Sequence, residues 1–196
     1  MAATVVSLLA LLFSGYSFYE SVLRAPEIAV YVPPLLDYTD PDRPDSPLEV
    51  FIIPVTLAND GARSGTVLSI DLTVTNPRTG QSKRFYAARV GPWSAEQARP
   101  FTPATLAGKG SYSEAVQFFP RVGEDVARIL DLEAGAYRLT LTLNTAAAAG
   151  PRFISEPRVA PLSFERQIGQ LDYRNFNGRG TMEMWAADYR PSGGAN

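Results

Sequence analysis

The N-terminal segment constrains this chain most, because it is too apolar to lie in water without a partner. From Ala2 to Tyr19 the sequence carries no charged side chain. A helix rises about 1.5 Å per residue, so a helix from Ala2 to Leu23 can cross a hydrocarbon layer of roughly 30 Å. The sequence therefore predicts one transmembrane anchor helix within residues 1–24, a single-pass protein at the cell membrane, and the lipid bilayer as a partner.

Two other interpretations of this segment stay open: a cleaved signal peptide and a helix buried in a soluble assembly. A signal peptide has a basic n-region and a small-residue cleavage site, and neither flanks the apolar run. The nearest fixed cation, Arg24, follows the helix. Because cytoplasmic flanks carry an excess of Lys and Arg, this arginine favours a cytoplasmic position for the rest of the chain.

Two groups of residues in the helix are candidates for contacts. Small side chains allow close approach of a second helix, although such residues are also simply tolerated in helices. Aromatic residues and the first charges gather at membrane–water interfaces. The predicted helix-packing residues are Ser7, Ser14, Gly15 and Ser17, and the predicted membrane-interface residues are Tyr16, Phe18, Tyr19 and Arg24.

After Pro26 the hydrophobic pattern changes to the alternation of β-strands. The clearest example is Thr66–Thr75, in which Leu68, Ile70, Leu72 and Val74 are expected on the buried face. Seven strands separated by turns are typical of a β-sandwich. The predicted strands cover residues 27–32, 48–57, 66–75, 84–90, 112–119, 137–143 and 159–168.

Between these strands the sequence predicts loops, one helix and an interrupted strand. Proline cannot donate to a strand ladder, so Pro54 indicates an edge or a bulge, and the Asp- and Pro-rich stretch 37–47 indicates a loop. Asn59-Asp60-Gly61 is typical of a turn with left-handed backbone. Residues 91–110 are expected to be irregular, and residues 124–130 to form a short helix.

The stretch from Leu132 to Tyr137 resembles the tyrosine corner of immunoglobulin-like sandwiches. The chain also resembles bacterial single-pass membrane proteins of unassigned function, in which an N-terminal helix leads into an Ig-like domain; the likeness rests on Tyr19, Glu20, Leu23 and Arg24 and on the stretch Val55–Leu68. The resemblance implies an all-β, immunoglobulin-like antiparallel β-sandwich over residues 27–168 with one N-terminal transmembrane helix. It brings no catalytic residues.

Composition limits the chemistry that the chain can perform. The sequence has no His and no Cys, which excludes Ser/His and Cys/His catalysis and the usual zinc sites. The net charge is -2, with neither sign gathered in a block, so nucleic acid is not an expected partner. We therefore predict no catalytic residue, no metal and no cofactor.

Acidic residues offer the only other candidates for chemistry. A calcium ion needs six to eight oxygen ligands, which Asp40, Asp42 and Asp45 could begin to supply, but the interleaved prolines favour a solvated loop. Adjacent acids at 124–125 and the acids at 131 and 133 could be proposed as a carboxylate pair. Acids at a helix start are better explained by the helix dipole.

The C-terminal segment, residues 169–196, is rich in aromatic residues. One interpretation is a strand over Thr181–Ala186 that packs on the domain, followed by a disordered end. The other is a partner-docking arm, because Trp, Tyr and Arg are enriched at interface hot spots. The docking candidates are Tyr173, Phe176, Trp185 and Tyr189.

Together these features favour a non-enzymatic accessory or structural subunit that stabilises a larger membrane protein complex, for example photosynthetic, respiratory or transport. Its partners would be other membrane protein subunits. The alternative is a freestanding membrane-anchored binding or sensing module, which would use its loops or add a strand at the Pro54 edge. A secreted lectin-like domain would require loss of the N-terminal segment.

Overall fold

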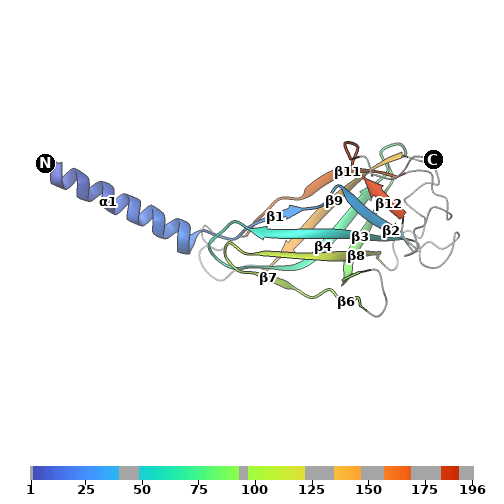
Figure 1. Ribbon diagram of the computed structural model, residues 1–196, viewed down its shortest axis with the longest axis horizontal. Helices are drawn as coiled ribbons and strands as arrows, with labels where there is room; N and C mark the ends of the chain where they lie inside the picture. The colour runs from blue at the N-terminus through green and yellow to red at the C-terminus, as the bar shows by residue number, and fades with distance from the viewer. Residues whose placement is uncertain are drawn as a thin grey trace.

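The chain folds into one long helix followed by a β-domain. The computed structural model describes residues 2–39, 49–92, 97–121, 135–146, 157–168 and 182–189. Helix α1 (Ala2–Phe18) continues into a π-helical turn, η1 (Tyr19–Leu23). The helix projects away from the β-domain, and the two meet only near the segment that connects them (Figure 1). The predicted N-terminal apolar helix is confirmed.

The described residues form twelve strands joined into one hydrogen-bonded sheet. The strands are β1 (Glu27–Tyr31), β2 (Leu35–Thr39), β3 (Val50–Asn59), β4 (Gly65–Thr75), β5 (Ser82–Val90), β6 (Arg99–Pro100), β7 (Ala104–Leu106), β8 (Ser111–Pro120), β9 (Gly135–Thr145), β10 (Arg158–Val159), β11 (Leu162–Ile168) and β12 (Met182–Trp185).

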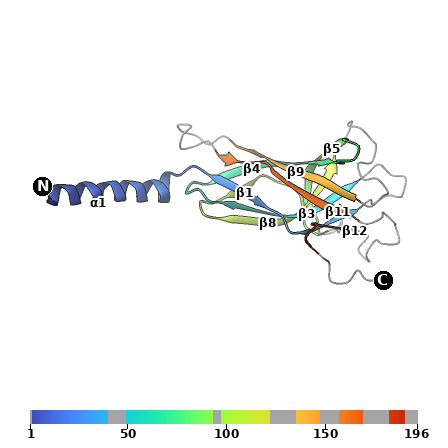
Figure 2. The same cartoon turned by 90° about the horizontal axis from the view of Figure 1, so that it is seen from above.

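Eight of these strands close into an antiparallel barrel. The order around the ring is β3, β2, β12, β11, β9, β4, β5 and β8. The ring closes at β8, where Phe118 is paired with Phe51 of β3 on one side and with Ala87 of β5 on the other. Strands β1, β10, β6 and β7 flank the barrel as additional pairings, and Figure 2 shows the barrel from above.

The prediction of an immunoglobulin-like sandwich is therefore wrong. A sandwich needs two separate sheets that pack face to face, whereas here the pairing runs without a break around the ring. Strand β2 lies partly in the stretch expected to be a loop, and β12 lies in the C-terminal segment. These two strands connect β3 to β11, and without them the ring would be open at this position.

Aromatic side chains fill the interior of the barrel. Tyr38, Phe51, Phe85, Phe118 and Tyr137 are fully buried. The rings of Tyr38 and Phe51 have centroids 5.3 Å apart, and Phe51 meets Phe85 edge-on at 4.9 Å. Such tilted contacts are favoured by the ring quadrupoles. Tyr137 thus belongs to the barrel core, on a strand that the sequence predicted correctly.

A β-bulge changes which residues of β4 are buried. The predicted alternation holds for Ile70, Leu72 and Val74, which are fully buried. The register against β9 shifts between Val67 and Ser69, so Val67 is buried and Leu68 is 47% exposed. An extra residue in one strand moves the following side chains to the other face, which the sequence pattern did not indicate.

One side of β3 is covered by two successive short strands. β2 pairs with the N-terminal part of β3 up to Ile52, and β1 pairs with the C-terminal part from Thr56. Pro54 lies between these pairings and is exposed, in agreement with the predicted edge. The break between β1 and β2 falls at Pro33 and Pro34, which cannot donate to a neighbouring strand.

Other sequence predictions have mixed outcomes. The strands expected near 27–32, 48–57, 84–90, 112–119 and 137–143 are present. The last predicted strand is divided into β10 and β11, and the stretch 91–110 contains the short strands β6 and β7. The predicted helix at 124–130 lies outside the described residues.

Candidate functional site

The apolar surface of α1 is exposed along its whole length. Residues Ala3–Leu23 form the one helix in the described part of the chain that is long and apolar enough to cross a membrane. None of it is buried against the β-domain, and Phe13 is 73% exposed. By length and composition this helix fits a membrane anchor or a signal sequence, and either role would cover its apolar side chains.

The predicted helix-packing residues all lie on this exposed helix. Ser7 donates a hydrogen bond to the carbonyl oxygen of Ala3 at 2.9 Å, one turn earlier. A Cβ added at Gly15 would meet no atom within 4 Å beyond its chain neighbours and the backbone of its own helix. Ser14 and Ser17 are exposed as well. Their packing against a partner helix remains a prediction.

The predicted interface residues occupy the last turns of the helix and the residue after it. Tyr16 and Phe18 are exposed, Tyr19 opens the π-helical turn, and Arg24 follows its end. Arg24 forms ion pairs with Glu20 of η1 at 3.0 Å and with Glu27 of β1 at 2.6 Å. The arginine thus connects the helix to the first strand.

A buried asparagine fixes the chain where the helix meets the barrel. Asn59 is 1% exposed. Its Oδ1 accepts hydrogen bonds from the backbone N–H groups of Glu27 and Gly61, and its Nδ2 donates to the carbonyl oxygens of Arg63 and Ala107. One side chain therefore joins the start of β1 to the β3–β4 turn and to the turn before β8.

Close backbone contacts complete this junction. The N–H groups of Ala62 and Arg63 both donate to the carbonyl oxygen of Arg24 at 3.1 Å. A Cβ at Gly61 would lie 2.1 Å from the carbonyl oxygen of Ala25, and one at Gly108 would lie 1.8 Å from that of Ala62. Only glycine allows these approaches. We call the contacts of Arg24, Asn59 and Gly61 the junction.

The expected left-handed turn at Asn59-Asp60-Gly61 is not observed. Among the described residues, positive φ values occur at Lys109, Gly80 and Gly91. Gly61 is required by the closeness of the Ala25 backbone rather than by its own conformation.

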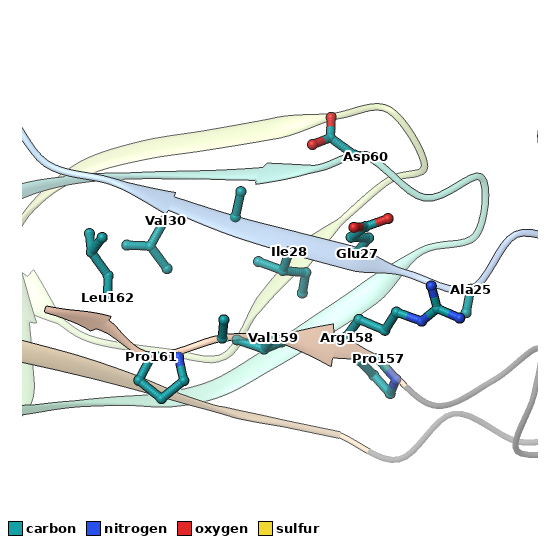
Figure 3. Close-up of a pocket in the computed structure, with 12 residues that line it drawn as sticks. Ala25, Glu27, Ile28, Val30, Asp60, Pro157, Arg158, Val159, Pro161 and Leu162 are labelled. Atoms are coloured by element: carbon teal, nitrogen blue, oxygen red, sulfur yellow. The ribbon is translucent and has the colours of Figure 1, made fainter.

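Beside the junction lies an open groove of about 900 Å³. Figure 3 shows it between β1 and the segment that forms β10 and the start of β11. Val159 and Leu162 line it with partly buried apolar side chains, and Ile28 and Val30 line it from β1 but are almost fully buried in the core. Charged residues lie mainly toward the junction, and they are Glu27, Asp60 and Arg158.

The groove exists because two strands that face each other are not paired. β10 pairs with β1 only at Glu27 and Ile28. β11 pairs with β9 along its full length, but with β12 only at Gln167. On the sides that line this gap, β1 has no neighbouring strand after Ile28 in the described part of the chain. The same is true of β11 before Gln167.

Arg166 spans the gap beyond the groove. Its side chain is on the inward face of β11, and the residue is only 6% exposed. Its Nη2 donates to the carbonyl oxygen of Pro33 at 2.5 Å, Nη1 donates to that of Glu165, and the guanidinium lies 4.5 Å from the Phe164 ring centroid. Burial lowers the pKa of the guanidinium, and nearby Asp188 partly opposes this effect. Arg166 thus links β11 to the break between β1 and β2, two places that no backbone pairing joins among the described residues.

A buried charged pair lies inside the barrel. Lys83 of β5 forms an ion pair with Glu49 at 2.9 Å, and both side chains are buried. The ammonium group also lies 5.7 Å from the centroid of Phe85. A buried pair of this kind satisfies its own charges, and it leaves no obvious acid or base for chemistry.

The aromatic docking candidates are only partly described. Tyr173 and Phe176 lie outside the described residues. Trp185 ends β12 and Tyr189 follows it, and both are half-buried. On the same strand, Met182 and Met184 are buried in the barrel core, so this part of the C-terminal segment is a structural strand. Docking by Trp185 and Tyr189 remains a prediction.

The acidic candidates for metal or catalytic roles give no site that can be analysed. Asp40, Asp42 and Asp45 lie outside the described residues, as do the acids at 124–125, 131 and 133. In the ranges that the structure describes, no group of three or more acidic side chains is placed to hold a metal ion.

Comparisons with known proteins give no family. No family model matches the chain, and no curated protein matches its sequence. A solved structure with some likeness is that of a Bordetella pertussis protein provisionally named ApaA, which is 14% identical. The match covers 85% of this chain and 99% of that one, with a TM-score of 0.35. This likeness is too low to support an argument about function.

Sequence reasoning missed the junction and the groove. The sequence pattern at Asn59 indicates only a turn, although a buried Asn can make up to four hydrogen bonds. The groove depends on how β10 and β11 separate at Ala160 and Pro161. The proline in this short interruption was the one available signal, because it ends a strand ladder.

Proposed function

We propose that this chain is a membrane-anchored, non-enzymatic accessory subunit that stabilises a larger membrane protein complex. In this proposal α1 is a retained anchor. Its apolar side chains are exposed in the structure of the single chain, and lipid or the helices of other subunits would cover them. The lack of His and Cys in the sequence supports a non-enzymatic role.

The junction is the observation that carries the proposal. A domain that only needs to be tethered can use a flexible linker. Here, Arg24 pairs with both the helix and β1, and Asn59 and the backbone of Arg24 bind the adjoining turns. Such a connection holds the barrel in a fixed relation to the helix, which suits a subunit that must present one surface to its neighbours.

Purification from membranes tests this role. The full chain with a C-terminal affinity tag is expressed in its own host, and membranes are washed with carbonate and then solubilised in a mild non-ionic detergent. We expect the chain to stay with the washed membranes and to elute with other membrane proteins in a fixed ratio. A carbonate-soluble protein with its first residues intact, or a monodisperse chain that elutes alone, would contradict the proposal.

The groove favours a second candidate function, a freestanding membrane-anchored binding module. A preformed apolar groove with a few polar groups is typical of binding sites. The same purification separates the two functions, because a binding module would elute as a single chain and still bind its ligand.

A further inference from the structure

We propose that the groove between β1 and β11 binds an extended peptide segment of a neighbouring membrane protein, which adds as a strand to the free edge of β1. This inference rests on the proposed function, since it names the kind of partner that the accessory subunit would hold.

Within the ranges that the structure describes, the edge of β1 beyond Ile28 has no neighbouring strand on the groove side. In an antiparallel pair, successive residues point their N–H and C=O groups to opposite sides. The N–H of Asp60 donates to the carbonyl oxygen of Glu27 at 2.8 Å, so Glu27 faces β3. The main-chain groups of Ile28 and Val30 therefore face the groove side, where Ile28 is paired with Val159 of β10 and Val30 has no strand beside it among the described residues.

Within the described residues, β10 satisfies only the first part of this edge. The N–H of Arg158 donates to the carbonyl oxygen of Pro26 at 2.9 Å, and the pairing ends at Ile28. Pro161, which follows, has no N–H to offer. The edge at Val30 is left for another strand, and exposed strand edges are templates for such pairing.

The side chains along the groove suit alternate residues of an incoming strand. Val30 and Leu162 come from the two unpaired edges and lie at the same end of the groove (Figure 3). Added strands gain affinity from main-chain hydrogen bonds and specificity from pockets for every second side chain. An apolar side chain at alternate positions would fill this part of the groove.

The position of the groove indicates where the segment comes from. Ala25 and Glu27, the first residues after the π-helical turn and its cap, line its other end. If α1 spans the bilayer, the groove opens close to the membrane surface. A juxtamembrane segment of a partner is therefore the matching source.

Peptide is favoured over a lipid acyl chain because of the free strand edge. An acyl chain could fill the apolar part of the groove, but it has no groups to pair with the main chain at Val30. A peptide supplies both the apolar side chains and the hydrogen bonds.

A defined peptide pair tests the inference on the full chain in non-ionic detergent micelles. The probe is a fluorescein-labelled peptide of alternating threonine and valine, measured by fluorescence anisotropy with empty micelles as the blank. The controls are two versions of the same peptide, one with N-methyl groups on its odd-numbered residues and one with N-methyl groups on its even-numbered residues, so that one of the two has the phase that faces β1. Methylation in the correct phase removes the N–H donors that would face β1 and places methyl groups against this edge, so we expect it to weaken binding about tenfold or more.

Two tryptophan variants locate the binding site. Ala160 lines the groove and is exposed, so Ala160→Trp fills the groove without disturbing the core. Ala187 is exposed in a turn away from the groove, and Ala187→Trp is its matched control. We expect Ala160→Trp to weaken peptide binding about tenfold, and Ala187→Trp to leave it unchanged.

Three results would overturn the inference. The first is equal binding of the methylated and unmethylated peptides. The second is peptide binding to the Ala160→Trp variant that is as strong as to the parent chain. The third is no binding at a peptide concentration of about 1 mM, which would place the Kd beyond the range of even weak complexes. Displacement of the peptide by dihexanoyl-phosphatidylcholine, together with equal binding of both peptides, would assign the groove to lipid. If partners co-purify while the peptide fails, the groove inference is wrong and the proposed function stands.

Discussion

Replacing Asn59 by alanine should both destabilise the barrel and loosen the helix from it. The side chain is buried and makes four hydrogen bonds to the backbone, at 2.8 to 3.1 Å. At about 1 kcal/mol for each lost hydrogen bond, Asn59→Ala should lower the free energy of unfolding by about 3 to 4 kcal/mol. Two backbone donors and two acceptors would be left without their partner.

Chemical denaturation, followed by the near-ultraviolet signal of the barrel aromatics, measures this loss. Asn144→Ala is the matched control, because Asn144 is exposed and its Nδ2 bonds only to the side chains of Ser69 and Asp71. Its cost should stay below about 1 kcal/mol, as for other surface positions. A cost at Asn59 equal to that of the control would refute the reasoning.

The mechanical part of the prediction uses the absence of cysteine in the sequence. Spin labels at Ser7→Cys on the helix and Arg84→Cys on the exposed face of β5 report the distance between helix and barrel. We expect a narrow distance distribution in the parent chain and a broad one with Asn59→Ala. Equally broad distributions in both would show that the junction does not fix the helix.

Three further predictions test single features. Gly61→Ala should destabilise the fold by about 1 to 3 kcal/mol, since its Cβ would overlap the Ala25 carbonyl, and a neutral result in thermal denaturation would contradict this contact. Gly15→Leu should leave barrel stability unchanged while reducing the recovery of co-purified partners; unchanged recovery would argue against packing at this position. Leu68→Thr should cost less than about 1 kcal/mol, whereas Ile70→Thr should cost more than about 2 kcal/mol, and similar losses in denaturant unfolding would refute the assigned bulge.

The helix and most strands could be predicted from the sequence because their signals are local. A charge-free run is sufficient to predict α1, and alternation is sufficient to predict β4. The burial of Val67 in place of Leu68 could not be predicted, since a bulge depends on the register with β9. Strand β2 was missed because its second half lies in the Asp- and Pro-rich stretch 37–47, which predicts a loop, although Leu36 and Tyr38 alternate around Asp37.

The closed barrel and the candidate site depend on contacts between distant parts of the chain. The sequence indicates seven strands in the domain, but it indicates neither the additional short strands nor that Phe118 is paired on both sides. In the same way, the role of Asn59 requires Arg63 and Ala107 to arrive at one point. Non-local pairing of this kind is what separates a barrel from a sandwich with the same strands.

The position of β12 has a consequence for biosynthesis. Strand β12 is synthesised after both of the strands that it bridges, β2 and β11. Until Met182–Trp185 have been made, these two strands lack the strand that joins them, and the hydrophobic interior stays incompletely covered. A stop codon before Met182 would therefore release a product with a gap between β2 and β11, and cellular proteases would be expected to degrade it.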